Sequence, residues 1–286
     1  MRDRTLSTAT HTLVMGVLNV TPDSFSDGGR LATTVGVDTA PAVEAGRRLW
    51  DEGADIIDVG GESTRPGALP VAVETELERT IPVVSALAAE GKLVSIDTSK
   101  PEVAAAALEA GAVIVNDVTG LGDPAMVEIC GTFGAGVVLM HMQGEPATMQ
   151  DDPRYADVVI EVRAHLVGRL ERSGLDPAAV CLDPGIGFGK TSDHNLTLLS
   201  HLQEFVSLGS PVLVGTSRKG FLGGILADAG CGEVSREQRD LATAATTALA
   251  VAAGVAVVRV HNVPMTVDVA RVADAIVREH SGEGKQ

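Results

Sequence analysis

The sequence alternates eight times between a short run of β-branched apolar residues and a longer Ala-, Leu- and Glu-rich segment of helical periodicity. The short runs are apolar throughout, as strands buried on both faces are, so the alternation predicts βα units and a parallel sheet. The expected strands are Leu13–Leu18, Ile56–Val59, Leu93–Ile96, Val113–Val115, Val137–Met140, Val180–Leu182, Val212–Val214 and Ala256–Val260. The expected helices are Ala42–Glu52, Glu76–Glu90, Pro101–Ala110, Pro124–Phe133, Asp157–Ser173, Asn195–Leu208, Gln238–Ala253 and Met265–Glu279.

Eight βα units in 286 residues are what a TIM barrel requires. An open doubly wound sheet usually has fewer units and carries a glycine fingerprint after its first strand. No Pro/Gly/Ser linker, charge block or low-complexity stretch divides the chain. We therefore predict an α/β fold, a TIM (β/α)8 barrel in a single domain over residues 1–286, with flexible ends at 1–12 and 281–286.

The composition excludes several classes of protein. With 22 Lys and Arg against 38 Asp and Glu, the net charge of −16 argues against a general nucleic-acid or anionic-membrane surface. One Trp, one Tyr and five Phe are too few for base-stacking platforms along single-stranded nucleic acid. The three separated cysteines support neither a disulfide framework nor a CxxC zinc site, and no apolar run is long enough to span a bilayer. A cytoplasmic protein is the expected result.

Polar residues end almost every predicted strand. In a parallel barrel these ends open onto one face, so residues distant in sequence would meet at a single mouth. Taken singly, an Asp or Asn here could simply cap the next helix, and this reading suits Asp58 and Asp117 best. The residues concerned are Asn19, Asp58, Asp97, Asn116, Asp117, His141, Asp183, Lys219, Arg259 and His261.

Two loops after predicted strands, residues 19–41 and 60–70, exceed the usual length of a βα connection and suggest a lid and a functional loop. A third segment, Asp183–Thr191, contains GKT, but Pro184 stands where a phosphate loop needs its first glycine. We interpret it as a tight turn that presents Asp183 and Phe188 to the mouth, with Lys190 a solvated charge or a phosphate contact.

Basic residues gather after the last two strands, where barrels of this kind commonly bind phosphate. TSRKG and RVHN bring Arg218, Lys219, Arg259 and His261 together in an otherwise acidic protein, which indicates an anionic ligand. Arg218 could instead pair with an acidic residue outside the barrel.

A metal bound to that anion would need few protein ligands. Zinc on His141 and His261 remains an alternative, but neither histidine has a partner at zinc-site spacing. Mg²⁺ held by phosphate oxygens and one or two protein oxygens is more economical. Asn19 is the first candidate ligand, and Asp27 is the second.

Taken in order, these motifs resemble the dihydropteroate synthase family over nearly the whole chain, from Leu13 to Val277. The matching segments are MGVLNVTPDSFSDGG (15–29), DVGGESTRPGA (58–68), SIDTSK (95–100), VNDVTG (115–120), LMHMQGEPATMQ (139–150), LDPGIGFGK (182–190), TSRKG (216–220) and RVHN (259–262). The resemblance implies a Mg²⁺-dependent enzyme that condenses 6-hydroxymethyl-7,8-dihydropterin diphosphate with 4-aminobenzoate, giving 7,8-dihydropteroate and diphosphate. It also implies an ionisation-first displacement without a covalent intermediate, sulfonamides as inhibitors and a homodimer.

The resemblance assigns roles to individual residues. Asn19 would bind the metal, and Asp27, Arg65 and Lys219 would be catalytic. The pterin site would comprise Asp97, Asn116, Met140, Asp183, Phe188 and Lys219. The diphosphate site would comprise Thr64, Arg259 and His261. The 4-aminobenzoate site would comprise Phe25, Arg65, Pro66, Phe188 and Gly220.

Two positions depart from the family pattern. Gly220 stands where many relatives have Ser beside the aminobenzoate carboxylate, although backbone N–H groups at a helix start can bind the same anion. Asn262 stands where RVHD is common, and we expect that residue only to orient its neighbours.

Three alternatives to a synthase stay open on the sequence. They are a pterin-binding module of a corrinoid methyltransferase, a Schiff-base aldolase that uses Lys219 or Lys190, and a silent paralogue that only binds pterin. The methyltransferase module would need neither the NVTPDSFSDGG loop nor the pair of Arg259 and His261.

Overall fold

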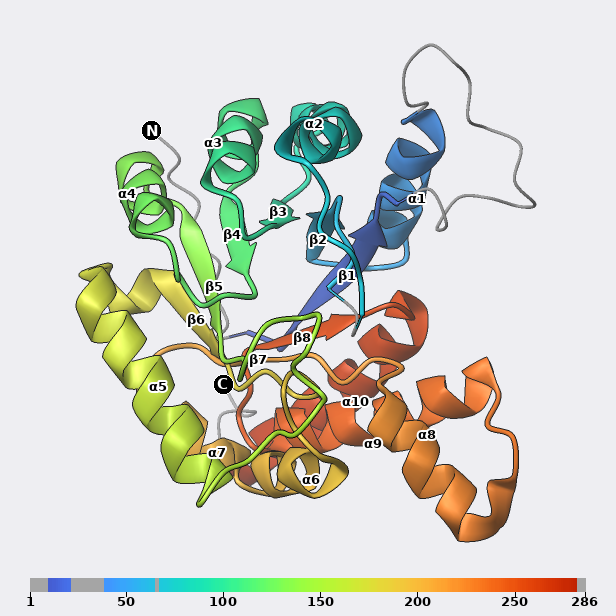
Figure 1. Cartoon of the computed structure of the whole chain (residues 1–286). Coiled ribbons are helices and arrows are strands. Elements are labelled where there is room, and N and C mark those ends of the chain that lie inside the picture. Colours follow the sequence, from blue (N-terminus) through green and yellow to red (C-terminus); the bar gives the residue numbers. More distant parts are fainter. Residues whose placement is uncertain (1–9, 22–38, 65–66, 282–286) are drawn as a thin grey trace.

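The computed structural model describes residues 10–21, 39–64 and 67–281, with the backbone alone from 278 onward. Within these residues a ring of strands is surrounded by helices (Figure 1). No described helix is both long enough and apolar enough to cross a membrane. The strands are β1 Leu13–Asn19, β2 Ile56–Gly60, β3 Val94–Asp97, β4 Ile114–Asp117, β5 Gly136–Met140, β6 Val180–Asp183, β7 Leu213–Val214 and β8 Val257–Val260. The helices are α1 Ala40–Asp51, α2 Val73–Ala89, α3 Pro101–Ala110, α4 Pro124–Phe133, α5 Val158–Ser173, α6 Ser192–Ser200, α7 Leu202–Val206, α8 Gly220–Leu226, α9 Arg236–Ala252 and α10 Val263–Ser281.

The eight strands are parallel and close into a barrel. Their order is β6-β5-β4-β3-β2-β1-β8-β7. The two ends of this series meet where Leu182 pairs with Val212 in a parallel bridge and its N–H donates to the carbonyl of Pro211 at 2.8 Å. The predicted TIM barrel is confirmed, and every predicted strand is present.

Side chains along each strand alternate between the inside of the barrel and the helices. One buried cluster fills the interior toward the amino ends of the strands. It contains Leu13, Met15, Ile56, Ile114, Val138, Leu213 and Val257. The residues between them, such as Val14 and Ile57, belong to the larger cluster that packs against the helices. Because side chains point to opposite faces with a period of two, the next inward position toward each carboxyl end is fixed by this pattern. Those positions are Asp58, Asp97, Asn116, Met140, Asp183 and Arg259, and in the longer β1 the same series continues through Val17 to Asn19.

The helices differ from the prediction in number and in some of their bounds. The expected helix Asn195–Leu208 is divided into α6 and α7, because His201 leaves helical geometry at φ −118° and ψ 23°. The short helix α8 was absent from the expected elements, since its sequence GFLGGIL is glycine-rich and lacks helical polarity. Helix α9 starts two residues before the expected Gln238, where the hydroxyl of Ser235 accepts from the N–H of Gln238 in a capping box.

Candidate active site

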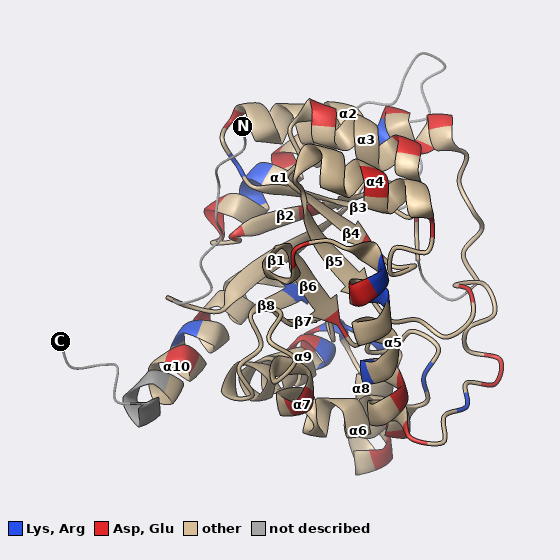
Figure 2. Ribbon diagram, turned by 90° about the vertical axis from the view of Figure 1, so that its left-hand side faces the viewer, with Lys and Arg blue, Asp and Glu red and all other residues tan. Residues whose placement is uncertain are grey.

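The inward positions at the carboxyl ends of the strands form a polar layer above the apolar interior. Asp58, Asp97, Asn116 and Asp183 are all buried. Many of the other acidic residues lie on the outer helices, including α2, α3 and α4 (Figure 2). The predicted convergence is therefore confirmed for these buried residues and for Arg259, which contacts Asp58 and Asp97. It does not extend to Asp117, which points away from the mouth.

Arg259 holds two carboxylates at once. Its Nε donates to Asp58 Oδ2 at 2.6 Å, and its Nη2 donates to Asp97 Oδ2 at 2.5 Å. Asn116 Nδ2 donates to the same Asp58 oxygen at 2.9 Å. The interpretation of Asp58 as a helix cap is wrong, because β2 points it into the barrel, where it anchors Arg259 and Asn116.

Burial changes the proton affinity of the carboxylates in this layer. Burial raises the pKa of Asp97 to about 7, although the charge of Arg259 opposes the rise. Burial also raises the pKa of Asp183, whose Oδ1 accepts from the N–H of Gly185 at 2.7 Å. Asp97 and Asp183 therefore hold their protons at a higher pH than an aspartate in water does.

Lys219 approaches the layer from the loop after β7. Its Nζ donates to the carbonyl of Ile186 and lies 4.1 Å from the centroid of the Phe188 ring, a cation–π contact. Burial lowers the pKa of Lys219 to about 7, partly offset by Asp183. Met140, also buried, pairs in register with Asp183 across β5 and β6. These residues of the predicted pterin site are thus neighbours.

The remaining described site residues lie at the edges of the mouth. His261 Nδ1 is 2.9 Å from the hydroxyl of Ser217, whose oxygen also accepts the His261 N–H. Thr64 is half-buried in the loop after β2, and Asn19 is half-buried at the end of β1. Gly220 opens α8, and a Cβ added there would meet open space.

Arg218 belongs to a separate, structural cluster. Its Nε and Nη2 donate to the two oxygens of Asp240 on α9, at 2.6 and 2.9 Å. The alternative reading of Arg218, an ion pair outside the barrel, is confirmed. Asn262 completes the cluster, because its Nδ2 donates to Asp240 Oδ2 at 3.0 Å and its Oδ1 accepts from the N–H of Met265.

This cluster predicts the effect of restoring the common family residue at position 262. Asn262→Asp would place a second carboxylate against Asp240 and is expected to lower the free energy of unfolding at pH 7 by about 1–3 kcal/mol. The loss should shrink toward pH 4, because protonating either carboxyl removes the repulsion. Urea unfolding at both pH values measures it, with the neutral Asn262→Ser as control. An equal loss in both variants at both pH values would contradict the charge explanation.

The interpretation of Asp117 is confirmed, and that of Lys190 is wrong. Asp117 accepts from the N–H and hydroxyl of Thr119 and from the N–H of Leu121, so its reading as a turn cap is confirmed. Lys190 is neither solvated nor placed on the surface for a phosphate: it is 3% exposed, and its Nζ is bonded to His141 and to loop carbonyls. That interpretation is wrong, and the sequence carried no signal of those partners.

Four predicted site residues, Phe25, Asp27, Arg65 and Pro66, lie outside the described residues, as does most of the predicted lid. No group of three or more His, Cys, Asp or Glu in the described ranges could hold a metal.

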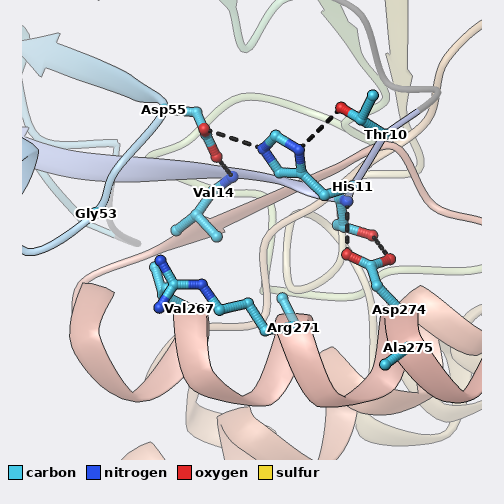
Figure 3. A pocket seen from close by; sticks show the side chains of 11 residues that line it. Thr10, His11, Val14, Gly53, Asp55, Val267, Arg271, Asp274 and Ala275 are labelled. Atoms are coloured by element: carbon cyan, nitrogen blue, oxygen red, sulfur yellow. Dashed lines mark hydrogen bonds and ion pairs between the residues drawn. The ribbon is translucent and has the colours of Figure 1, made fainter.

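A cavity of about 460 Å³ lies away from this mouth, beside the start of β1 and the helix α10 (Figure 3). Its polar groups are engaged internally: Asp55 binds the N–H of Val14 and faces His11, and Asp274 accepts from the N–H and hydroxyl of Thr12. These bonds tie residues 11 and 12 to the barrel. The cavity does not share the chemistry of the strand ends.

Comparison with known proteins agrees with the geometry. The family model described as pterin binding enzyme matches residues 15–261. The dihydropteroate synthase of Escherichia coli K12 is 45% identical over 269 residues, which cover 93% of this chain and 92% of the relative. The Yersinia pestis dihydropteroate synthase in complex with a sulfonamide drug has a TM-score of 0.86 at 40% identity, covering 96% and 97% of the two chains. The Xanthomonas albilineans dihydropteroate synthase in complex with 7,8-dihydropteroate has a TM-score of 0.81 at 41% identity, covering 95% of each chain.

A closed barrel with a buried polar layer at its strand ends, together with these matches, defines a pterin-binding enzyme. The chain belongs, within that class, to the dihydropteroate synthase family, whose members are transferases.

Proposed function

We propose that the protein condenses 6-hydroxymethyl-7,8-dihydropterin diphosphate with 4-aminobenzoate to give 7,8-dihydropteroate and diphosphate. The observation that carries the proposal is the buried layer of Asp97, Asn116 and Asp183 beside Lys219 in a member of this family. A pterin presents a row of N–H donors on its aminopyrimidinone edge. Buried carboxylate and amide oxygens satisfy those donors, and a ligand without them would leave the oxygens unpaired.

The diphosphate end would lie against Thr64, Arg259 and His261. Arg259 has donors to spare, because its Nη1 makes no hydrogen bond to any residue in the described ranges. An arginine held in place by two carboxylates can therefore present its free edge to an anion without reorganising. Negative charge that develops on the departing diphosphate would be stabilised there.

Mg²⁺ fits the residues present at this edge. Asn19 faces the mouth from β1, and its side-chain amide makes no hydrogen bond to the part of the chain that the structure describes, which leaves an oxygen ligand available. When bound, Mg²⁺ would supply positive charge that favours departure of the diphosphate.

In the proposed mechanism the methylene–diphosphate bond breaks first, and the dihydropterin ring delocalises the cation. The amine of 4-aminobenzoate then forms the new C–N bond and loses a proton, so no covalent bond to the enzyme arises. Lys219, with its pKa lowered to about 7 by burial, would donate to the pterin beside the Phe188 ring.

We assign the 4-aminobenzoate pocket to Phe25, Arg65, Pro66, Phe188 and the backbone of Gly220, with Asp27 and Arg65 as further catalytic residues. Closure of the two loops that carry Asp27 and Arg65 would exclude water, the competing nucleophile. Sulfonamides would compete for the same pocket. The cytoplasmic location expected from the sequence stays a prediction.

Purified protein tests the proposal when it is incubated with both substrates and Mg²⁺. We expect dihydropteroate and diphosphate in equal amounts, loss of product with EDTA, and its return with added Mg²⁺. Pterin binding without product would instead identify a silent paralogue. A product-free reaction that borohydride traps on a lysine would identify the Schiff-base alternative.

We also propose a homodimer, through an exposed apolar face on α9 and α10. Leu241 and Leu249 on α9 are 61% and 66% exposed, and Val272 and Ile276 on α10 are 63% and 66% exposed. Exposed apolar patches of this kind mark association surfaces, and a second copy presents the same patch by two-fold symmetry.

Leu249→Glu should convert the dimer to a monomer, because association would bury an unpaired carboxylate. Light scattering coupled to size-exclusion chromatography measures the mass. Ile160→Glu, at a position on α5 that is 63% exposed, is the matched control and should leave the mass unchanged. A wild-type monomer, or two variants that behave alike, would refute this face.

A further inference from the structure

The loop between β6 and α6 has five successive carbonyls, and a side chain binds each of them. Tyr155 and Gln150 belong to the segment after β5, and Lys219 follows β7, so two other parts of the chain converge on this loop, whose own Lys190 supplies the remaining bonds. The bonds run from Lys190 Nζ to Gly185 O (3.0 Å) and Phe188 O (2.9 Å), from Gln150 Nε2 to Gly187 O (2.8 Å), from Tyr155 Oη to Gly189 O (2.8 Å), and from Lys219 Nζ to Ile186 O.

The backbone path of this loop depends on its glycines. Gly185, Gly187 and Gly189 have φ values of +66°, +83° and +59°, which L side chains rarely adopt. A Cβ on Gly185 would lie 1.8 Å from the carbonyl oxygen of His141, and one on Gly189 would lie 2.3 Å from that of Gln143. The loop therefore packs directly on the backbone after β5, and these two positions leave no room for a side chain.

Lys190 is the central support. Its Nζ has three acceptors within 3.0 Å, His141 Nδ1 and the carbonyls of Gly185 and Phe188, which match the three donors of an ammonium group. The carbonyl of His141 lies farther away, at 3.4 Å. Burial lowers the pKa of His141 to about 2, so the imidazole is neutral and its Nδ1 can accept. His141 in turn packs edge-on against His165 of α5, with 4.8 Å between ring centroids. A lysine buried to this extent is costly, and an apolar side chain of similar length would fill the space more cheaply.

The bonds of Lys190 affect two side chains of the proposed substrate pocket, Phe188 and Lys219. Lys190 binds the carbonyl of Phe188, whose ring lies under Lys219 Nζ, and Lys219 itself binds the neighbouring carbonyl of Ile186. A shift of the loop backbone would move both side chains together. A displacement of about 1 Å is enough to weaken the binding or the reaction of a substrate that must be held in a fixed geometry.

We propose that Lys190, braced by His141 and joined by Gln150 and Tyr155, is a positioning residue that fixes Phe188 and Lys219 as the floor of the pterin and aminobenzoate sites. The proposal rests on the function proposed above. In this proposal the LMHMQGEPATMQ segment and the lysine of LDPGIGFGK do not contact the substrate. They affect substrate binding because they hold the backbone of the 185–189 loop in place.

A double-mutant cycle between Lys190 and Phe188 tests the proposal, with titration calorimetry of 7,8-dihydropteroate as the readout. Lys190→Met keeps the length of the side chain and removes its donors, and should raise the Kd about tenfold. In a Phe188→Ala background the same change should raise it by less than about threefold, because the ring that Lys190 positions is already gone and only the effect through Lys219 remains. The matched control is Lys92→Met, which removes a lysine bonded to Glu90 and should leave the Kd unchanged.

Equal effects of Lys190→Met in both backgrounds, or a lower melting temperature with an unchanged Kd, would reduce Lys190 to a structural role and overturn the proposal. If Lys190→Met does not fold, Tyr155→Phe, which deletes only the hydroxyl bound to Gly189, enters the same cycle with the same criterion. Wild-type protein that fails to bind dihydropteroate would instead count against the proposed function, so the two failures are distinguishable.

Discussion

Asp97→Ala is expected to weaken pterin binding by roughly 1–3 kcal/mol, which corresponds to a loss in affinity of about fivefold to 150-fold. Two costs add in this variant. First, the pterin N–H groups that would donate to this carboxylate are left buried without a partner. Second, Arg259 loses one of the two carboxylates that hold it, because its bond to Asp97 Oδ2 at 2.5 Å is removed. Calorimetric titration with 6-hydroxymethylpterin measures the change. Unchanged affinity in a folded variant would refute the role of Asp97.

The pH dependence gives an independent check on the same residue. Because burial raises the pKa of Asp97 to about 7, its carboxylate is ionised above that pH and takes a proton below it. Wild-type pterin affinity should therefore fall as pH decreases from 8 to 6. The Asp97→Asn variant should bind weakly at every pH and lose this slope.

Linkage gives the opposite sign for stability. A raised pKa means that the native state binds this proton more tightly than the unfolded chain does, so the contribution of Asp97 to stability decreases as pH rises from about 4 to 7. Asp97→Asn removes that decrease, which urea unfolding across the interval would detect.

Arg259→Leu is expected to have the largest effect on stability, about 3–5 kcal/mol, because it leaves buried carboxylates without their cation. Asp58 is fully buried and Asp97 nearly so, and both lie within 2.6 Å of the guanidinium. The pKa of Asp97 should rise further, since the Arg259 charge is what opposes its increase. Binding of the substrate diphosphate should also be lost.

Urea unfolding at pH 7.5 measures the effect, and a compensating variant identifies its cause. Adding Asp58→Asn to Arg259→Leu removes one unpaired charge and should recover part of the lost stability. If the double variant is less stable than Arg259→Leu alone, the loss does not come from unpaired carboxylates.

Much of the fold follows from local sequence patterns. Each strand is a short apolar run and each helix has its own periodicity, so eight βα units and their barrel can be predicted without any long-range information. The period of two also decides which strand-end residue faces inward. Asn116 continues the inward series of Ile114, whereas Asp117, one residue later, points outward and caps a turn.

The partners of the charged residues could not be predicted in this way. Arg259 binds Asp58 and Asp97, which precede it by 201 and 162 residues, and no local pattern links them. The same holds for Arg218 with Asp240 and for Lys190 with His141. Many acceptors elsewhere in the sequence could have bound each of these cations, and only the packing of remote elements decides which of them do.

By itself the sequence determined the barrel, the strand ends and the set of polar residues at one mouth, because these depend on local periodicity and on the parallel topology. Only the tertiary structure decided which carboxylates hold Arg259, that Lys190 is buried under the 185–189 loop, and that Arg218 lies outside the site. Ion pairing and burial depend on distances between segments that are remote along the chain, and those distances exist only after the barrel has closed.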